Sequence, residues 1–231
     1  MAVDDAYTVA LLHMNGSDGS TTFTDESGKS WTAAANAQID TAQSKFGGAS
    51  GLFDGTGDYI SAPDSADWQL DGGSNSNSWT VDMWIRFASD PSATAAPIVQ
   101  QYVDASNYWA AFFAVDRLYF RIRSGGTNIV DFSQAWSAAA NQWYHLALVK
   151  DGTNGYTFYV DGTKLTTNTD TDTMPDFNGA LYLGRVITTA TYYLDGWIDE
   201  VRISKGIARW TADFTPPTSE YTPPAGSNFF F

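Results

Sequence analysis

The sequence contains no cysteine, so it can form neither a disulfide framework nor a cysteine-based metal cluster. It has only 12 lysine and arginine residues against 26 acidic residues, which gives a formal net charge of −14. Such a surface repels phosphate backbones. No apolar run approaches the roughly 20 residues that a membrane-spanning helix needs. We therefore expect neither nucleic acid nor a membrane among the partners.

Glutamate is also scarce. The chain has three glutamates, at Glu26, Glu200 and Glu220, and the other 23 of its 26 acidic residues are aspartates. Aspartate favours turns and helix caps, whereas glutamate favours helix interiors. No long window shows the 3.6-residue period of an amphipathic helix. The sequence therefore predicts many turns and little helix.

The start of the chain lacks the features of a secretory signal. The residues after Met1 read "AVDDAYTV" and include neither a basic cluster nor an apolar run. We therefore expect the protein to be made and folded in a cytoplasm, with no signal peptide.

Short strands and turns fill most of the chain. Residues 78–89 alternate, with Val81, Met83, Ile85 and Phe87 on one face, which predicts a strand with one buried face. Residues 141–152 are apolar on both faces, which predicts a strand covered on both sides. Asp161 and Gly162 suit a two-residue type I′ hairpin turn. Because turn signals recur throughout, we predict one all-β domain, an antiparallel two-sheet sandwich.

The end of the chain differs in composition. The stretch "TPPTSEYTPPAGSNFFF" has four prolines and no strand pattern. Prolines favour an extended path without ladder hydrogen bonds. We therefore predict a domain over residues 1–214 and an extended tail over residues 215–231.

The tail ends in three consecutive phenylalanines, which are a liability if they stay in water. We expect Phe229, Phe230 and Phe231 to dock on a neighbouring subunit or another protein. The alternative is that the tail folds back over the edge of its own sheet.

One strand-like stretch, "YYLDGWIDEVRIS" (residues 192–204), does not alternate cleanly. Leu194 and Ile198 share one parity, whereas Trp197, Val201 and Ile203 share the other, and two carboxylates lie side by side in the middle. A β-bulge there would let Ile198 and Val201 both point inward, because a bulge adds one residue to one strand. The carboxylates of Asp199 and Glu200 would then lie at a sheet edge or end.

Five segments in order resemble the laminin-G-like, concanavalin-A-like jelly-roll family. They are "LLHMNGSDGSTTFTDESGKSW", "FGGASGLFDGTGDYISAPDS", "WTVDMWIRF", "QWYHLALVKDGTNGYTFYVDGTKL" and "LDGWIDEVRISKGIARWTADFTPP". The resemblance covers roughly residues 7–217. The opening and closing segments look most like versions of this domain in phage virion proteins.

The resemblance implies a two-sheet jelly roll in which the late strand pairs close to the N-terminal strand. It also implies a non-enzymatic structural or interaction module in a virion, either a decoration or cement protein or a tail-associated protein. Other virion proteins or identical subunits would be the partners, and a homo-oligomer is expected. A glycan-binding adhesin that touches host polysaccharide is the alternative function.

Oxygen-bearing side chains near the strand break could hold a structural calcium ion. Calcium takes 6–8 oxygen ligands. The predicted ligands are Asn15, Asp18, Asp25, Asp199 and Glu200. The alternative is purely structural: Asp199 accepts backbone N–H groups of a turn, and Glu200 pairs with Arg202 or a backbone donor.

Aromatic residues make up 15% of the chain and include nine tryptophans. Sugars stack on exposed aromatic rings, so an open aromatic face would suit a glycan. The candidates are Trp84, Tyr102, Tyr108 and Trp109. The alternative is that these rings belong to the ordinary core between the sheets or to a subunit interface.

Enzymatic activity has little support in the sequence. Glycoside hydrolases of this fold use two carboxylates on one strand face, whereas the three glutamates here are far apart in the sequence. Neither a G-x-S-x-G elbow nor an H-E-x-x-H motif is present. We therefore expect no catalytic residues.

Overall fold

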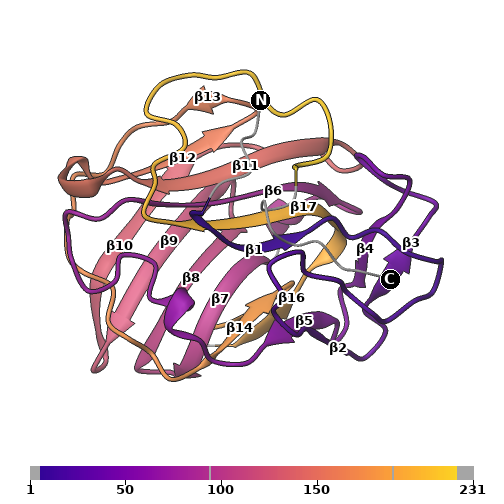
Figure 1. Ribbon diagram of the computed structural model, residues 1–231, viewed down its shortest axis with the longest axis horizontal. Helices are drawn as coiled ribbons and strands as arrows, with labels where there is room; N and C mark the ends of the chain where they lie inside the picture. Colours follow the sequence, from indigo (N-terminus) through magenta and orange to yellow (C-terminus); the bar gives the residue numbers. More distant parts are fainter. Residues whose placement is uncertain (1–5, 94, 189, 223–231) are drawn as a thin grey trace.

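The computed structural model describes residues 6–93, 95–188 and 190–222. In this part of the chain, two antiparallel β-sheets pack face to face (Figure 1). Among the described residues, the helices are three short 3-10 helices, Ala66–Trp68, Pro91–Ala93 and Gly152–Asn154. The prediction of an all-β, two-sheet sandwich is therefore confirmed. None of the described helices has the length and hydropathy needed to cross a bilayer.

The first sheet has eight strands. In spatial order they are β13 (Thr163–Lys164), β12 (Tyr156–Val160), β11 (Trp143–Lys150), β6 (Trp79–Phe87), β17 (Asp195–Lys205), β4 (Ser50–Asp54) and β3 (Gln38–Asp40), with β1 (Thr8–Leu12) also paired to β17. The last strand in the sequence therefore lies in the middle of this sheet, and it pairs with the first strand as expected.

The second sheet has seven strands. In spatial order they are β10 (Thr127–Ala135), β9 (Arg117–Ser124), β8 (Asn107–Ala114), β7 (Ala96–Asp104), β14 (Ala180–Leu183), β5 (Tyr59–Ala62) and β2 (Thr32–Ala34). A separate hairpin of β15 (Arg185–Ile187) and β16 (Thr191–Tyr193) follows β14. It is tied to β7 because the side-chain amide of Gln100 both accepts from the N–H and donates to the carbonyl of Ile187, each over 2.8 Å.

The predicted alternation explains how β6 is placed. Every second residue of β6 is apolar and lies in the core between the sheets; these residues are Val81, Met83, Ile85 and Phe87. Rings from both sheets meet there: Trp79 of β6 lies 5.7 Å from Phe120 of β9 and 5.9 Å from Tyr156 of β12, measured between ring centroids. The hairpin after β12 turns at Asp161 and Gly162, both with positive φ, as a type I′ turn requires.

Residues 206–222 form an extended segment, which we call the strap. It runs back over the outer face of the eight-stranded sheet, the face turned away from the core. Its residues Ala208, Trp210 and Phe214 pack on Ala147, Val149 and Tyr159 of β11 and β12. This cover explains why residues 141–152 are apolar on both faces.

The strap is joined to the sheet at its middle by backbone contact. The Phe214 N–H donates to the Gly162 carbonyl over 2.9 Å. A Cβ at position 162 would lie 1.8 Å from the Phe214 carbonyl oxygen, so glycine is required there for the close approach as well as for the turn.

Contacts with the sandwich continue beyond the predicted domain boundary at Phe214. Tyr221, expected in a tail that leaves the domain, is only 2% exposed and is buried against the domain's own eight-stranded sheet. The expected alternative, in which the segment folds back, therefore applies up to residue 222. The docking residues Phe229, Phe230 and Phe231 lie outside the described residues.

Candidate functional site

The strand break in β17 is a β-bulge, as predicted. Asp199 pairs with Trp84 and Arg202 with Asp82, so three steps along β17 match two steps along β6. Glu200 takes the strained backbone conformation with φ of +52°. Ile198 and Val201, on either side of the bulge, are both fully buried in the core.

The carboxylates of Asp199 and Glu200 lie at the point where β17 exchanges one pairing strand for another on the side opposite β6. On one side β17 pairs with β6 throughout; on the other it pairs with β4 up to Ile198 and with β1 from Val201. Asp199 and Glu200 therefore lie in the gap between β4 and β1, and both are 0% exposed. This corrects the expectation of an accessible sheet edge, because loops and the strap cover the gap.

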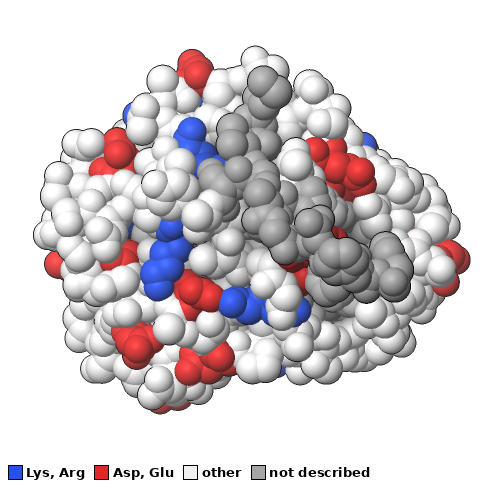
Figure 2. All heavy atoms as spheres, in the orientation of Figure 1, with Lys and Arg blue, Asp and Glu red and all other residues white. Residues whose placement is uncertain are grey.

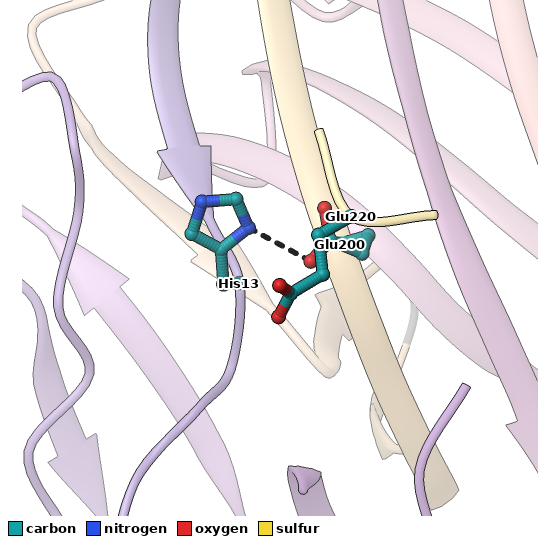
Figure 3. A group of neighbouring side chains, drawn as sticks. All are labelled: His13, Glu200 and Glu220. Atoms are coloured by element: carbon teal, nitrogen blue, oxygen red, sulfur yellow. Dashed lines mark hydrogen bonds and ion pairs between the residues drawn. The ribbon is translucent and has the colours of Figure 1, made fainter. Parts of the chain in front are cut away.

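Glu200 is held by a histidine and by the strap. His13, just after β1, lies with Nδ1 2.8 Å from Glu200 Oε1, and the N–H of Tyr221 donates to Glu200 Oε2 over 2.8 Å. Figure 3 shows Glu220 of the strap directed toward the same point. Asn15 donates to Glu220 Oε1 over 2.6 Å.

The close approach of Asn15 and Glu220 depends on a glycine. A Cβ on Gly47 would lie 2.1 Å from Asn15 Oδ1 and 2.3 Å from Glu220 Oε1. Larger residues at position 47 would therefore push these two side chains apart, and they would also be strained at its φ of +59°.

Asp199 is the more unusual of the two carboxylates. Its Oδ2 accepts hydrogen bonds from the N–H groups of Lys45 (2.7 Å) and Phe46 (3.1 Å), whereas its Oδ1 has no partner among the described residues. Burial raises the pKa of Asp199 to about 7, against the opposing effect of the two N–H donors. Burial likewise raises the pKa of Glu200. The pKa of His13 is also raised, since the hydrogen bond and charge of Glu200 outweigh the effect of burial.

These directions predict that stability falls as the pH rises from about 4.5 to 7.5. In the unfolded chain aspartate ionises near pH 4, whereas in the folded chain Asp199 ionises only near pH 7. Between the two values the folded state binds more protons, so raising the pH favours unfolding. The raised pKa of His13 acts in the same direction above about pH 6.5, because the charged form that Glu200 stabilises is then lost.

Thermal melting followed by circular dichroism across this pH range tests the prediction. We expect the melting temperature of the Asp199→Asn variant to change much less with pH than that of the wild type. The exposed Asp116→Asn variant should keep the wild-type slope. An Asp199→Asn slope equal to that of the wild type would contradict the assignment.

A second buried network adjoins the bulge on the same face. Arg202 holds Asp82 through two hydrogen bonds of 3.0 Å, from Nε to Oδ1 and from Nη2 to Oδ2. The hydroxyl of Tyr221 donates to Asp82 Oδ2, and its ring lies 4.0 Å from the Arg202 guanidinium. His145 Nε2 lies 3.0 Å from the same hydroxyl. Although burial opposes ionisation, Arg202 and His145 hold the pKa of Asp82 well below its usual range.

The predicted calcium ligands do not come together as one group. Asp25 accepts from the N–H groups of Leu11 and Ser27 and from the indole of Trp31, and Asp18 accepts from Thr41. Asp199 and Glu200 bind backbone N–H groups, as in the structural alternative. Calcium binding stays a prediction, but these residues do not form the oxygen cage that it needs.

A different set could hold a metal ion. Within the described part of the chain, the group of metal-ligand side chains whose ligand atoms lie within 4.8 Å of one another is His13, Glu200 and Glu220. One nitrogen and two carboxylates suit zinc better than calcium. His13 and Glu220 could not be predicted as partners of Glu200, because neither lies near it in the sequence.

The structure separates the four predicted glycan-binding aromatics. Trp109 is 0% exposed in the core between the sheets. Trp84 lies on the outer face of the eight-stranded sheet, where the Lys45 ammonium sits 3.8 Å above its ring and Phe46 packs against its edge. Tyr102 and Tyr108 lie together on the outer face of the seven-stranded sheet, 6.2 Å apart. The four therefore do not form one open surface.

The outer face of the seven-stranded sheet carries other aromatic rings that sequence analysis missed. Phe112 of β8 and Tyr119 of β9 stack at 5.0 Å with an interplanar angle of 4°. Tyr59 and Tyr182 meet edge to face at 5.6 Å on the other side of the β15–β16 hairpin. A small apolar cluster of Tyr108, Ala110, Phe112 and Val186 joins the hairpin to the sheet. Strict alternation along β8 and β9 would have identified this face.

Comparison with known proteins agrees with the fold. A family model described as the concanavalin A-like lectin/glucanases superfamily matches residues 54–209. The fold is similar to domain 4 of AbnA, a GH43 extracellular arabinanase from Geobacillus stearothermophilus, in complex with arabinotriose. The TM-score is 0.63 at 20% identity, and the match covers 87% of this chain and 94% of that one.

Two toxin domains are similar as well. The binding domain of Paraclostridial Mosquitocidal Protein 1 has a TM-score of 0.65 at 15% identity, and that of botulinum neurotoxin serotype D has 0.61 at 14%. Each match covers 87% of this chain but 49% of the toxin chain, so the protein spans about half the length of these domains. A search of curated proteins finds no match. Because the family model covers more than half of the sequence, the chain belongs to the concanavalin A-like lectin/glucanase superfamily.

Proposed function

We propose that the protein is a non-enzymatic carbohydrate-binding module, and that it binds through the outer face of its seven-stranded sheet. The observation that carries the proposal is a set of partly exposed tyrosines on this face and on its hairpin. They are Tyr59, Tyr102, Tyr119, Tyr182 and Tyr192. A sheet holds such rings rigidly, and sugars stack their apolar faces on them at little entropic cost.

The similar structures support a binding role. The arabinanase domain, which matches over nearly its whole length, is described in complex with arabinotriose. Another similar structure, at 13% identity and a TM-score of 0.64, concerns cell entry of botulinum neurotoxin type C through interaction with two ganglioside molecules. Both descriptions concern carbohydrate-bearing ligands.

The carboxylates argue against glycoside hydrolysis. Glu200 and Glu220 come close, but Glu200 is 0% exposed and each of its oxygens already accepts a hydrogen bond. A glycosidase needs two carboxylates that flank a bound sugar, with one positioned to donate a proton. Glu200 already binds His13 and the N–H of Tyr221, so it is not free to flank a sugar in this way.

A structural role in a phage virion is the second function that we propose, and it is compatible with the first. Its support is the resemblance of the opening and closing segments, which the structure joins through β1, β17 and the strap. Mass spectrometry of purified particles tests it: the protein should be present in them, and its absence would end the proposal. Other virion proteins or identical subunits would then be partners.

Binding of the purified protein to an array of neutral and acidic glycans tests the carbohydrate proposal. We expect Tyr119→Ala to weaken the best ligand by about tenfold, the effect of losing roughly 1.4 kcal/mol of stacking and contact. Tyr7→Ala removes a 45% exposed tyrosine next to the other sheet and should leave binding unchanged. Equal losses in both variants, or no glycan binding at all, would contradict the proposal.

A further inference from the structure

Arginine is concentrated on the proposed binding face. The chain has only seven arginines, and four of them lie on this face: Arg117, Arg121, Arg123 and Arg185. The first three alternate along β9 with Leu118, Phe120 and Ile122, which point into the core. Because the net charge is −14, charges spread evenly over the surface would not place four of the seven arginines on one face. Figure 2 shows basic and acidic side chains next to one another on the side of the molecule that it views.

Arg185 has the most unusual surroundings. Its guanidinium lies 3.9 Å from the ring centroid of Tyr182 and 4.5 Å from that of Tyr59. Among the described residues it makes no ion pair within 4.0 Å, and its buried Nε has no hydrogen-bond partner. The two rings hold the planar group by cation–π contact, so its position is fixed without a carboxylate.

The arginines of β9 are only partly neutralised. Arg121 pairs with Asp131 over 2.9 Å. Arg117 donates to the hydroxyl and carbonyl of Ser133, and Arg123 donates to the amide oxygen of Asn128. Neutral partners leave the positive charges of Arg117 and Arg123 uncompensated.

Arg121 and Tyr182 lie on one row across the sheet. Arg121 pairs with Ala110, Ala110 with Gln100, and Gln100 with Tyr182, the ring beneath Arg185. Three strand spacings of about 4.8 Å separate the ends of this row, roughly 14 Å. Arg185 is the first residue of the β15–β16 hairpin, which Gln100 in this row holds through Ile187. A single extended ligand of a few sugar units is long enough to reach both ends.

We propose that the ligand of this face is an acidic polysaccharide whose carboxylate groups are bound by Arg185 and by the arginines of β9. This inference rests on the proposed function and names the class of glycan. A guanidinium presents a planar fork of N–H donors that matches a carboxylate in a bidentate way. Stacking on Tyr59 and Tyr182 fixes the plane of Arg185, while uncommitted donors remain to meet an anion. The adjacent tyrosine rings receive the apolar faces of the sugars.

Calorimetric titration with oligogalacturonate and with neutral arabino-oligosaccharide of equal length tests the inference. We expect the wild type to bind the uronate more tightly, with an affinity that decreases as salt rises. Arg185→Gln should lose about tenfold in uronate affinity, as expected for one charge-assisted contact, and should keep its affinity for the neutral sugar. Arg185→Lys should fall between the two, because it keeps the charge but not the fork.

Arg86→Gln is the matched control. Arg86 also lies over an aromatic ring, 4.7 Å from that of Trp197, but it belongs to the eight-stranded sheet. This variant removes the same charge from the protein and should bind the uronate as the wild type does. Equal melting temperatures for the variants ensure that differences in binding do not reflect unfolding.

The outcomes separate the two proposals. If neutral sugars bind as well as uronates, or if Arg86→Gln loses as much affinity as Arg185→Gln, the acidic ligand is wrong while the carbohydrate-binding function stands. If neither sugar binds and no glycan on the array does, both proposals fail. A selective loss in Arg185→Gln supports the inference.

Discussion

Replacing Arg202 by methionine is expected to lower the free energy of unfolding by about 3–5 kcal/mol, as is usual when one partner of a buried ion pair is removed. The Asp82 carboxylate is 0% exposed, and Arg202 supplies both of its charged hydrogen bonds. Without that charge, the carboxylate must either stay ionised in a poorly solvated site or take up a proton. Both cost free energy in the folded state.

Urea unfolding at pH 7 measures this effect. The matched control is Arg121→Met, which breaks a partly exposed pair with Asp131 and should lower the free energy of unfolding by less than about 1 kcal/mol. If Arg202→Met also loses less than that, the buried network does not hold the sheet as described.

Shortening the chain to end at Phe214 is expected to lower the melting temperature by roughly 6–20 °C, taking about 3–5 kcal/mol for loss of a large buried aromatic residue and about 2–4 °C per kcal/mol for a domain of this size. The truncation removes Tyr221, whose hydroxyl donates to Asp82 and whose N–H donates to Glu200. It also uncovers the Arg202 guanidinium.

Point variants separate the contributions of Tyr221. Tyr221→Phe keeps the ring against Arg202 and should lose about 1.5–3 kcal/mol of unfolding free energy, the effect of one hydrogen bond to a charged group. Ser219→Ala, at an exposed position in the same segment, should melt as the wild type does. If the truncated chain instead keeps its melting temperature and loses self-association or particle attachment, the docking hypothesis for the tail is right and the strap is dispensable for folding.

The strands were predictable because their signals are local. Alternation in residues 78–89 identified β6, the positive-φ pair Asp161 and Gly162 identified the hairpin, and the change of parity in residues 192–204 identified the bulge. Each of these features follows from the pleat of a strand or from the conformational freedom of a turn residue.

The proposed binding face could not be predicted from aromatic content alone, because the side of a sheet on which a ring lies depends on its position within the strand. Tyr108 and Trp109 are consecutive in β8, so their side chains must point to opposite sides of the sheet. Only one of them could belong to an outer surface. Trp84 is inaccessible for another reason. Its side chain does point outward, but Lys45 and Phe46, about 40 residues earlier in the sequence, cover its ring.

The position of the strap could not be predicted from its prolines, because proline constrains the local backbone and not what that backbone contacts. The prolines of residues 215–222 do prevent ladder pairing, yet an extended segment can still bury a side chain such as Tyr221. The apolar residues on both faces of β11 indicate where the strap lies. Ala147 and Val149 are on the outer face of β11, and residues of the strap bury them.

The place of β17 in the middle of the eight-stranded sheet constrains how the chain folds during synthesis. A ribosome delivers β1, β4 and β6 long before it delivers β17, the strand that hydrogen-bonds to all three. Until Lys205 has emerged, these strands keep unpaired edges, which are open to pairing with other chains. Because the joining contacts span nearly the whole sequence, we expect folding to be slow and to finish only after translation of this domain is almost complete.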